Sequence, residues 1–181
     1  EHRQQAAKLF GGALRLTDKR PDNFLYLGLI KAVLPSAKFI VTERDWRDTA
    51  TSIFSVRLGP SQNYATNLRN IRHYIGLQQG LVDHWASVLD PDLYRISYED
   101  IVREPRQAVG KLLRWLGEEW NDNCLEFHGL KNAVKTASVW QVRQPIYKTS
   151  KARWKRYETH LAPLIQGTNA KITWEPIEMV T

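Results

Sequence analysis

The sequence has little cysteine and no long hydrophobic segment. Its single cysteine, Cys124, cannot form a disulfide within the chain or build a metal site without other ligands, and a small buried apolar role suits it better. No apolar run reaches the ~18 residues that a membrane-spanning helix needs, because Lys31 interrupts the longest candidate, residues 23–34. The first residues lack the pattern of a signal peptide. We therefore expect a cytoplasmic protein with no membrane span and no metal.

Acidic residues are missing from one part of the chain. The 181 residues carry 26 Lys and Arg against 19 Asp and Glu, a formal net charge of +7. Residues 131–157 hold eight of the basic residues and no acidic one, so the remainder has 18 basic and 19 acidic residues, a net charge of −1. The positive excess thus belongs to one segment, which indicates an anionic ligand near it. A balanced remainder without a nucleic-acid motif argues against a nucleic-acid-binding protein.

Strand-like and helix-like segments alternate along the chain. Short apolar runs predict strands at residues 13–17, 38–42 and 94–97. Helical patterns occupy residues 23–34, 45–58, 64–89, 105–116 and 150–160. This alternation predicts an α/β fold, in which a parallel sheet is flanked by helices, within one domain.

Two of the predicted helices differ in how much of their surface is apolar. Residues 23–34 are apolar nearly all round, which indicates a buried helix. Residues 64–89 carry an apolar stripe at helical spacing that is expected to pack inward: Leu68, Ile71, Ile75, Val82, Trp85 and Leu89.

Folds of this class bind ligands at the carboxyl ends of their strands. That rule selects three places: Asp18-Lys19, residues 44–52 and Tyr98-Glu99. Lys19 lies two residues before Pro21 in a polar turn, where its charge could stabilise negative charge on a leaving group. A solvated turn lysine is the alternative interpretation.

Arg44 follows the predicted central strand at the start of a helix. A helix N-terminus favours anions, and a guanidinium matches the geometry of phosphate. Ser52 comes eight residues later, a little over two turns, on the same side of the helix. Both side chains could therefore bind one phosphate. Pairing of Arg44 with Asp45 or Asp48, with Ser52 merely packed, is an equally weighted alternative.

The basic segment interleaves cations with aromatic rings. Its polar and aromatic members include Ser138, Trp140, Gln141, Arg143, Tyr147, Lys148, Arg153 and Trp154. Segments of this kind bind nucleotides, with guanidinium groups on phosphate and rings on the base. A solvated charged face is the alternative, although such faces normally mix both signs of charge.

Several stretches of the sequence, taken together, resemble the sulfotransferase family. They are TDKRPDNFLYLGLI, KFIVTERDWRDTATSIFS, YATNLRNIRHYIGL, LVDHW, ISYEDIV, LLRWLG and TASVWQVRQPIYKTSKARWKRY, in order from about Leu14 to Leu164. The likeness is greatest to bacterial members with tetratricopeptide repeats upstream. It implies a P-loop-NTPase-like fold and transfer of a sulfuryl group from 3′-phosphoadenosine 5′-phosphosulfate to a hydroxyl or amine. Adenosine 3′,5′-bisphosphate would be the product, and no metal would be needed.

The resemblance also implies which residues bind the donor. Arg44 and Ser52 match the family's 3′-phosphate motif, an arginine after a central strand with a serine eight residues on. Tyr98 matches a tyrosine that lies near the adenine in relatives. Gln141 and Arg143 are implied as further donor contacts.

Catalytic positions follow from the same resemblance. Lys19 matches the family's basic residue close to the transferring group, two residues before a proline. Ser138 and Arg153 match active positions in the part that closes over donor and sulfuryl group. Residues 131–160 would thus form a basic segment that covers the donor.

One part of the family pattern is missing from the sequence. Relatives begin with a strand and a glycine- and serine-rich loop that binds the 5′-phosphosulfate, and Gly11-Gly12 cannot serve as that loop. We therefore expect residues 1–181 to be a single, amino-terminally truncated sulfotransferase domain. Its expected partners are an acceptor substrate of unknown class and an upstream tetratricopeptide region or a missing amino-terminal segment. A non-catalytic module that binds a nucleotide or another anion is the alternative function.

Overall fold

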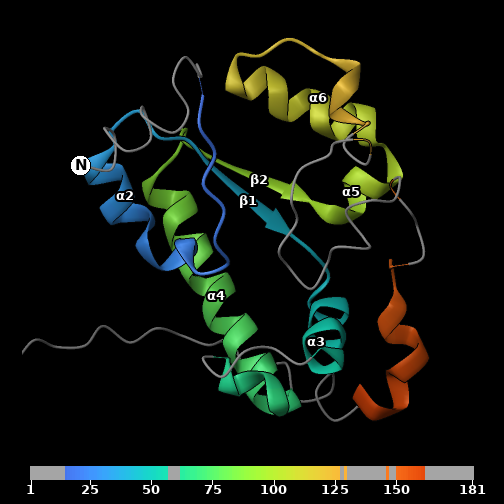
Figure 1. The fold of residues 1–181 in the computed structure, drawn as a ribbon. Coiled ribbons are helices and arrows are strands. Elements are labelled where there is room, and N and C mark those ends of the chain that lie inside the picture. Colours follow the sequence, from blue (N-terminus) through green and yellow to red (C-terminus); the bar gives the residue numbers. More distant parts are fainter. Residues whose placement is uncertain (1–14, 57–61, 127–128, 130–145, 147–149, 162–181) are drawn as a thin grey trace, which may run out of the picture.

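The computed structural model describes residues 15–56, 62–126, 129, 146 and 150–161 (Figure 1). Helices and strands alternate along these residues, and η denotes a 3-10 helix. In chain order they are η1 (Asn23–Tyr26), α2 (Leu27–Val33), β1 (Phe39–Glu43), α3 (Trp46–Ser55), η2 (Asn63–Thr66), α4 (Leu68–Val88), β2 (Leu93–Ser97), α5 (Tyr98–Arg103), α6 (Pro105–Leu116), η3 (Asp122–Cys124) and η5 (Arg153–Tyr157).

The two strands of the described residues pair in parallel. Phe39 lies opposite Leu93, and Glu43 lies opposite Ser97, so both strands end at the same edge of the sheet. Two strands predicted from the sequence, at residues 38–42 and 94–97, are confirmed within one residue at their ends. Parallel strands need a long crossover, and here α3 and α4 supply it.

Helices cover both faces of the sheet. Arg95 of β2 forms an ion pair with Asp83 of α4, with 2.6 Å between nitrogen and oxygen. The next side chain back, Tyr94, points to the other face, where its ring lies 5.2 Å from the ring of Trp115 in α6. Because neighbouring side chains of a strand point to opposite faces, these contacts place α4 and α6 on opposite sides of the sheet. The predicted α/β class is confirmed.

Helix α4 carries two clusters of buried side chains. One cluster joins α2 and the start of β1 to the end of α4 through Leu27, Phe39 and Leu89. The other packs α3 on the first half of α4 through Ala50, Ile71 and Ile75. The predicted inward stripe of this helix is therefore confirmed. Over the described ranges, no helix combines the length and the apolar composition that crossing a bilayer requires.

The strand predicted at residues 13–17 is wrong over residues 15–17, which form no strand. The guanidinium of Arg15 instead binds the Glu118 carboxylate and donates to the carbonyl of Leu116 at 3.1 Å. Leu16 remains 53% exposed. Side-chain contacts with the end of α6 thus hold this short run, and its apolar residue gains no burial from a neighbouring strand. Residues 13–14 lie outside the described residues.

The helix predicted for residues 23–34 is confirmed, but its predicted burial is wrong. This segment forms η1 and then α2, and only Leu27 of these residues is buried. The exposed apolar side chains are Leu25, Tyr26, Leu29 and Val33. The helix packs against α4 and β1 by one face, so its remaining apolar residues stay in contact with solvent.

Gly28 lets α2 approach the indole ring of Trp85. A Cβ atom at position 28 would lie 2.6 Å from Cη2 of that ring, and the ring is held by a 2.8 Å hydrogen bond from its N–H to the carbonyl of Phe24. Gly28→Ala gains up to about 1 kcal/mol of helix propensity, whereas overpacking costs about 1–3 kcal/mol. We expect the free energy of unfolding, measured by urea titration, to fall by ~1 kcal/mol.

Gly110 offers a matched control in α6. A Cβ atom there would meet its nearest neighbours, side-chain atoms of Arg114 and Trp120, at an ordinary 3.8 Å. Gly110→Ala should therefore raise the free energy of unfolding by about 1 kcal/mol. Equal stabilisation by both substitutions would contradict the close contact of Gly28 with Trp85.

Candidate functional site

Two of the three places selected from the sequence meet where β1 and β2 end (Figure 1). The chain leaves β1 into α3 and leaves β2 into α5. The backbone N–H of Asp45 donates to Oε1 of Glu99 at 3.0 Å. The hydroxyl of Ser97 donates to the other oxygen of the same carboxylate at 3.1 Å. Glu99 therefore ties the start of α3 to the end of β2.

Arg44 lies between these two strand ends and the C-terminal segment. Its guanidinium stacks over the ring of Tyr98, 4.7 Å from the centroid. One terminal nitrogen donates to the carbonyl of Ser150 at 2.5 Å. The nearest carboxylate oxygen of Asp48 is 3.9 Å from that nitrogen, so the two side chains form an ion pair without a hydrogen bond, which confirms the alternative partner Asp48 to that extent. The buried Nε has no hydrogen-bond partner among the described residues, so this donor is unused there.

The first turn of α3 already holds a carboxylate of its own. Asp45 accepts from the backbone N–H of Arg47 at 2.8 Å and caps the helix. The side chain of Arg47 also donates to it, from Nε at 2.9 Å. This side-chain hydrogen bond is the main reason that the pKa of Asp45 is lowered. The backbone N–H of Arg47 is therefore not free to bind the anion that the sequence predicts here. Binding of that anion would depend more on the side chain of Arg44.

Asp48 holds the C-terminal segment against α3. Its side chain is 1% exposed. One oxygen accepts from the N–H of Ala152 at 2.7 Å and the other from the N–H of Trp154 at 2.8 Å. The buried Trp154 ring lies under the guanidinium of Arg47, 3.9 Å from its centroid. Figure 1 shows residues 150–161, in orange and red, beside α3.

No pattern in the sequence indicates this role for Asp48. The sequence indicates Asp48 only as an alternative partner of Arg44, in place of a phosphate. The groups that bind Asp48 are backbone N–H groups more than 100 positions away, and backbone groups leave no signature in the sequence. An acidic residue in the first turn of a helix is common for a local reason, its favourable interaction with the helix dipole.

The described residues bring some of the predicted site together. Arg44 and Tyr98 are in contact. Arg153 is exposed in η5, next to the residues bound by Asp48, and Ser52 is half-buried two turns along α3. Lys19 is exposed and forms no ion pair with another described residue. Ser138, Gln141 and Arg143 lie outside the described residues.

A group of aromatic side chains lies close to the segment that carries Lys19. The rings of Tyr64 and Tyr74 stack with centroids 4.0 Å apart, and Phe24 meets Tyr74 edge-on at 6.4 Å. Burial raises the pKa of both tyrosine hydroxyls, and the charge of Asp22 adds to the effect. These rings form a half-buried apolar surface, and the ring nearest to Lys19 along the chain, Phe24, follows it by five residues.

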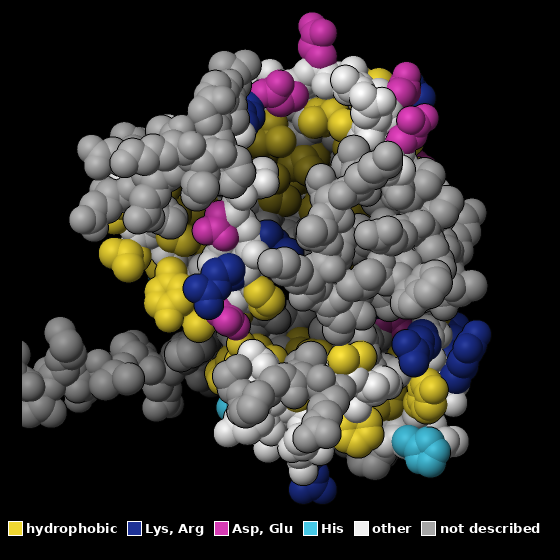
Figure 2. Space-filling view, in the orientation of Figure 1, with side chains coloured by type: hydrophobic (Ala, Val, Ile, Leu, Met, Phe, Trp, Pro, Cys, Tyr) yellow, Lys and Arg dark blue, Asp and Glu magenta, His cyan; other side chains and the backbone are white. Residues whose placement is uncertain are grey.

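Charge is unevenly spread over the face seen in Figure 2. Lys and Arg side chains gather at the lower right, where Figure 1 draws residues 150–161, whereas Asp and Glu side chains gather at the top. The described residues contain no group of three or more His, Cys, Asp or Glu side chains suited to a metal ion. The Lys and Arg side chains at the lower right favour an anion as the ligand of this part of the surface.

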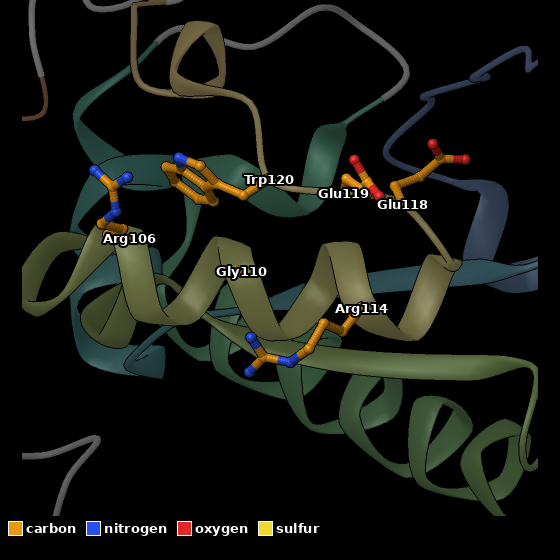
Figure 3. Close-up of a pocket in the computed structure, with 6 residues that line it drawn as sticks. All are labelled: Arg106, Gly110, Arg114, Glu118, Glu119 and Trp120. Carbon is orange, nitrogen blue, oxygen red and sulfur yellow. The ribbon is translucent and has the colours of Figure 1, made fainter.

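A depression of about 400 Å³ lies on the outer side of α6 (Figure 3). It is lined by Arg106, Gly110, Arg114, Glu118, Glu119 and Trp120. Its charges are mixed, and the guanidinium of Arg106 is already stacked on Trp120 at 4.8 Å. None of the residues predicted from the sequence to bind or react lines it, so it is a separate feature from the site at the strand ends.

Several curated proteins are similar to this chain in sequence. An uncharacterised protein of Aquifex aeolicus (strain VF5) is 34% identical over 165 residues, which are 90% of this chain and 22% of that protein. Protein-tyrosine sulfotransferase A of Caenorhabditis elegans is 24% identical over 150 residues, 78% of this chain and 39% of that protein. The protein-tyrosine sulfotransferase of Drosophila melanogaster is 26% identical over 153 residues, 78% of this chain and 30% of that protein. The chain thus spans well under half the length of these curated relatives.

The fold has a solved counterpart in a sulfotransferase domain from the curacin biosynthetic pathway. The two superpose with a TM-score of 0.61 at 20% identity, over 89% of this chain and 66% of that one. This likeness confirms the predicted sulfotransferase fold. A family model described as "Sulfotransferase family" matches residues 2–122, which is more than half of the sequence. On these matches, the chain belongs to the sulfotransferase family.

Proposed function

We propose that this protein binds 3′-phosphoadenosine 5′-phosphosulfate at the carboxyl ends of β1 and β2 and transfers its sulfuryl group to a hydroxyl or amine. The observation that carries the proposal is the position of Arg44. Its guanidinium lies at that edge, between the ring of Tyr98 and the carbonyl of Ser150, and keeps a buried Nε without a partner among the described residues. An arginine with an unused donor beside an aromatic ring suits a phosphorylated nucleoside.

In this proposal, three described residues bind the nucleotide part of the donor. Arg44 and Ser52 bind the 3′-phosphate, and Tyr98 lies near the adenine. Support comes from their order along the fold, since Arg44 precedes α3, Ser52 lies two turns along it, and Tyr98 contacts Arg44. Gln141 and Arg143 are proposed as further donor contacts on the strength of the sequence pattern alone.

The remaining proposed residues act on the reacting group. When bound, the donor supplies the sulfuryl group and a phosphate leaving group. Lys19 stabilises negative charge that develops on the leaving oxygen, while Ser138 and Arg153 complete the set of donors and charges around the transferring group. Such transfer depends mainly on positioning and electrostatics, so each fixed cation lowers the barrier.

For the acceptor we propose an aromatic hydroxyl, with tyrosine in a peptide as the first substrate to test. Two matched relatives are named protein-tyrosine sulfotransferases. The aromatic group of Phe24, Tyr64 and Tyr74, close to the Lys19 segment, offers ring faces against which a phenol could pack.

Calorimetry with the full-length protein tests the donor. Adenosine 3′,5′-bisphosphate should bind at least about tenfold more tightly than adenosine 5′-monophosphate, because hydrogen bonds to a charged phosphate contribute about 1.5–3 kcal/mol. Equal affinities would contradict a 3′-phosphate site. Mass spectrometry of a tyrosine peptide incubated with the donor then tests transfer. A preference for the bisphosphate with no sulfated product from any hydroxyl or amine would leave the non-catalytic binding module.

A further inference from the structure

We propose that Asp48 is a positioning residue for donor binding. It fastens residues 150–161 to α3 and thereby holds Arg44 and the exposed Arg153 at the donor site. The inference rests on the proposed function above and adds a residue that is expected to touch neither donor nor acceptor.

The first argument is the environment of the carboxylate. Asp48 is almost fully buried, with 1% of its side chain exposed. A buried carboxylate is costly unless it is hydrogen-bonded or paired. Its two oxygens accept from the N–H groups of Ala152 and Trp154 at 2.7 and 2.8 Å, distances typical of charge-assisted bonds. The bonds that compensate its burial therefore come mainly from the C-terminal segment.

The second argument is the backbone that Asp48 stabilises. Ala152 has a φ of 57°, in the left-handed region. This conformation is unfavourable for a residue with a Cβ atom, because the Cβ comes too close to the following carbonyl oxygen. It turns the chain into η5 so that the N–H groups of Ala152 and Trp154 point to one carboxylate. Without Asp48, both the strained turn and two N–H groups would lack their compensation.

The third argument is that the other contacts of this segment come from residues close to Asp48 in the sequence, just before α3 and in its first turn. Arg44 donates to the carbonyl of Ser150 at 2.5 Å. Arg47 stacks on the ring of Trp154 at 3.9 Å. Residues 44–48 thus bind residues 150–154 at three points, and one of those points is the arginine proposed for the 3′-phosphate. If the segment detaches, Arg44 loses the carbonyl that orients it.

Hydrogen exchange measured by mass spectrometry tests the attachment directly. In Asp48→Asn, one oxygen is replaced by an amide group that cannot accept a hydrogen bond. We expect peptides that cover residues 150–161 to exchange about tenfold faster or more, while peptides of β2 keep their rates. Asp83→Asn is the matched control, since Asp83 is an exposed aspartate of α4 with one ion pair. Unchanged exchange at 150–161, or an equal rise in β2, would overturn the proposal.

Calorimetry with adenosine 3′,5′-bisphosphate tests the consequence for the site. Asp48→Asn should weaken binding about tenfold, and Asp83→Asn should leave it within about twofold. If Asp48 acts through Arg44, the double variant with Arg44→Ala should bind no more than about twofold more weakly than Arg44→Ala alone. Wild-type affinity in Asp48→Asn, or fully additive losses, would overturn the positioning role.

A second variant keeps the test decisive if Asp48→Asn does not fold. Arg47 is a third exposed, and Arg47→Gln removes its charge from the ring of Trp154. Exchange at 150–161 should again rise locally, with bisphosphate binding weakened about threefold to tenfold. No change in either measurement would overturn the proposal. Equal wild-type affinity for the bisphosphate and the monophosphate would instead contradict the proposed function, and the exchange data would still decide whether Asp48 holds the segment.

Discussion

Arg44→Ala is expected to weaken binding of adenosine 3′,5′-bisphosphate about a hundredfold and to remove most sulfuryl transfer. The loss corresponds to ~3 kcal/mol, the upper range for hydrogen bonds to a charged group. Arg44 lies between the strand ends and the C-terminal segment, and its buried Nε has no partner among the described residues. Alanine removes both the charge and the stacking partner of Tyr98.

Two variants separate this effect from a general loss of charge. Arg44→Lys keeps the charge but loses the planar fork of donors, so its affinity should lie between those of wild type and Arg44→Ala. Arg106→Ala removes an exposed arginine that also stacks on an aromatic ring, in α6, and it should bind the bisphosphate as wild type does. Near-normal affinity and turnover in Arg44→Ala would refute the phosphate assignment.

Lys19→Ala is expected to slow sulfuryl transfer while leaving donor binding nearly unchanged. Its kcat should fall about a hundredfold, because removing one preorganised stabiliser of developing charge costs ~3 kcal/mol of barrier. Affinity for the intact donor, measured without acceptor, should stay within about threefold, because the negative charge on the leaving oxygen develops only as the sulfuryl group departs. Single-turnover assays with the full donor measure the first quantity, and calorimetry measures the second.

The alternative for Lys19, a solvated turn lysine, makes the opposite prediction. Lys19 is exposed, so the Lys19→Ala variant should fold normally. An unchanged kcat in this variant would show that the Lys19 side chain contacts only solvent. Lys111→Ala, which removes an exposed lysine of α6, controls for a change in net charge. Lys19→Arg should retain part of the rate, because it keeps a cation in the same turn.

Most of the helices and strands could be predicted because their signals are local. The β-branched run before Arg44 became β1, and the stripe of α4 became buried. Pro105 opens α6, and Gly117 closes it with a φ of 77°, a left-handed value that suits glycine. Each of these features depends on residues within one turn or one strand, where spacing is sufficient.

The errors and omissions share a different cause. The predicted strand at 13–17 failed because Arg15 binds the end of α6, and the helix at 23–34 is only partly buried because one face alone meets α4 and β1. Tyr98 and Arg44 were each predicted at strand ends, yet nothing in their spacing said that they stack on each other. Tertiary contacts of this kind depend on how elements pack, which no local pattern encodes.

The bonds that Asp48 receives come from the main chain, and that fact bears on how this segment can vary among relatives. Every amino acid except proline carries a backbone N–H, so these two hydrogen bonds do not depend on which side chains stand at 152 and 154, whereas the contact of Arg47 with the Trp154 ring does. Proline at either position would delete one of the two bonds. The exposed side chains of residues 150–161 can therefore differ among relatives, while these two bonds keep the backbone of the segment on α3.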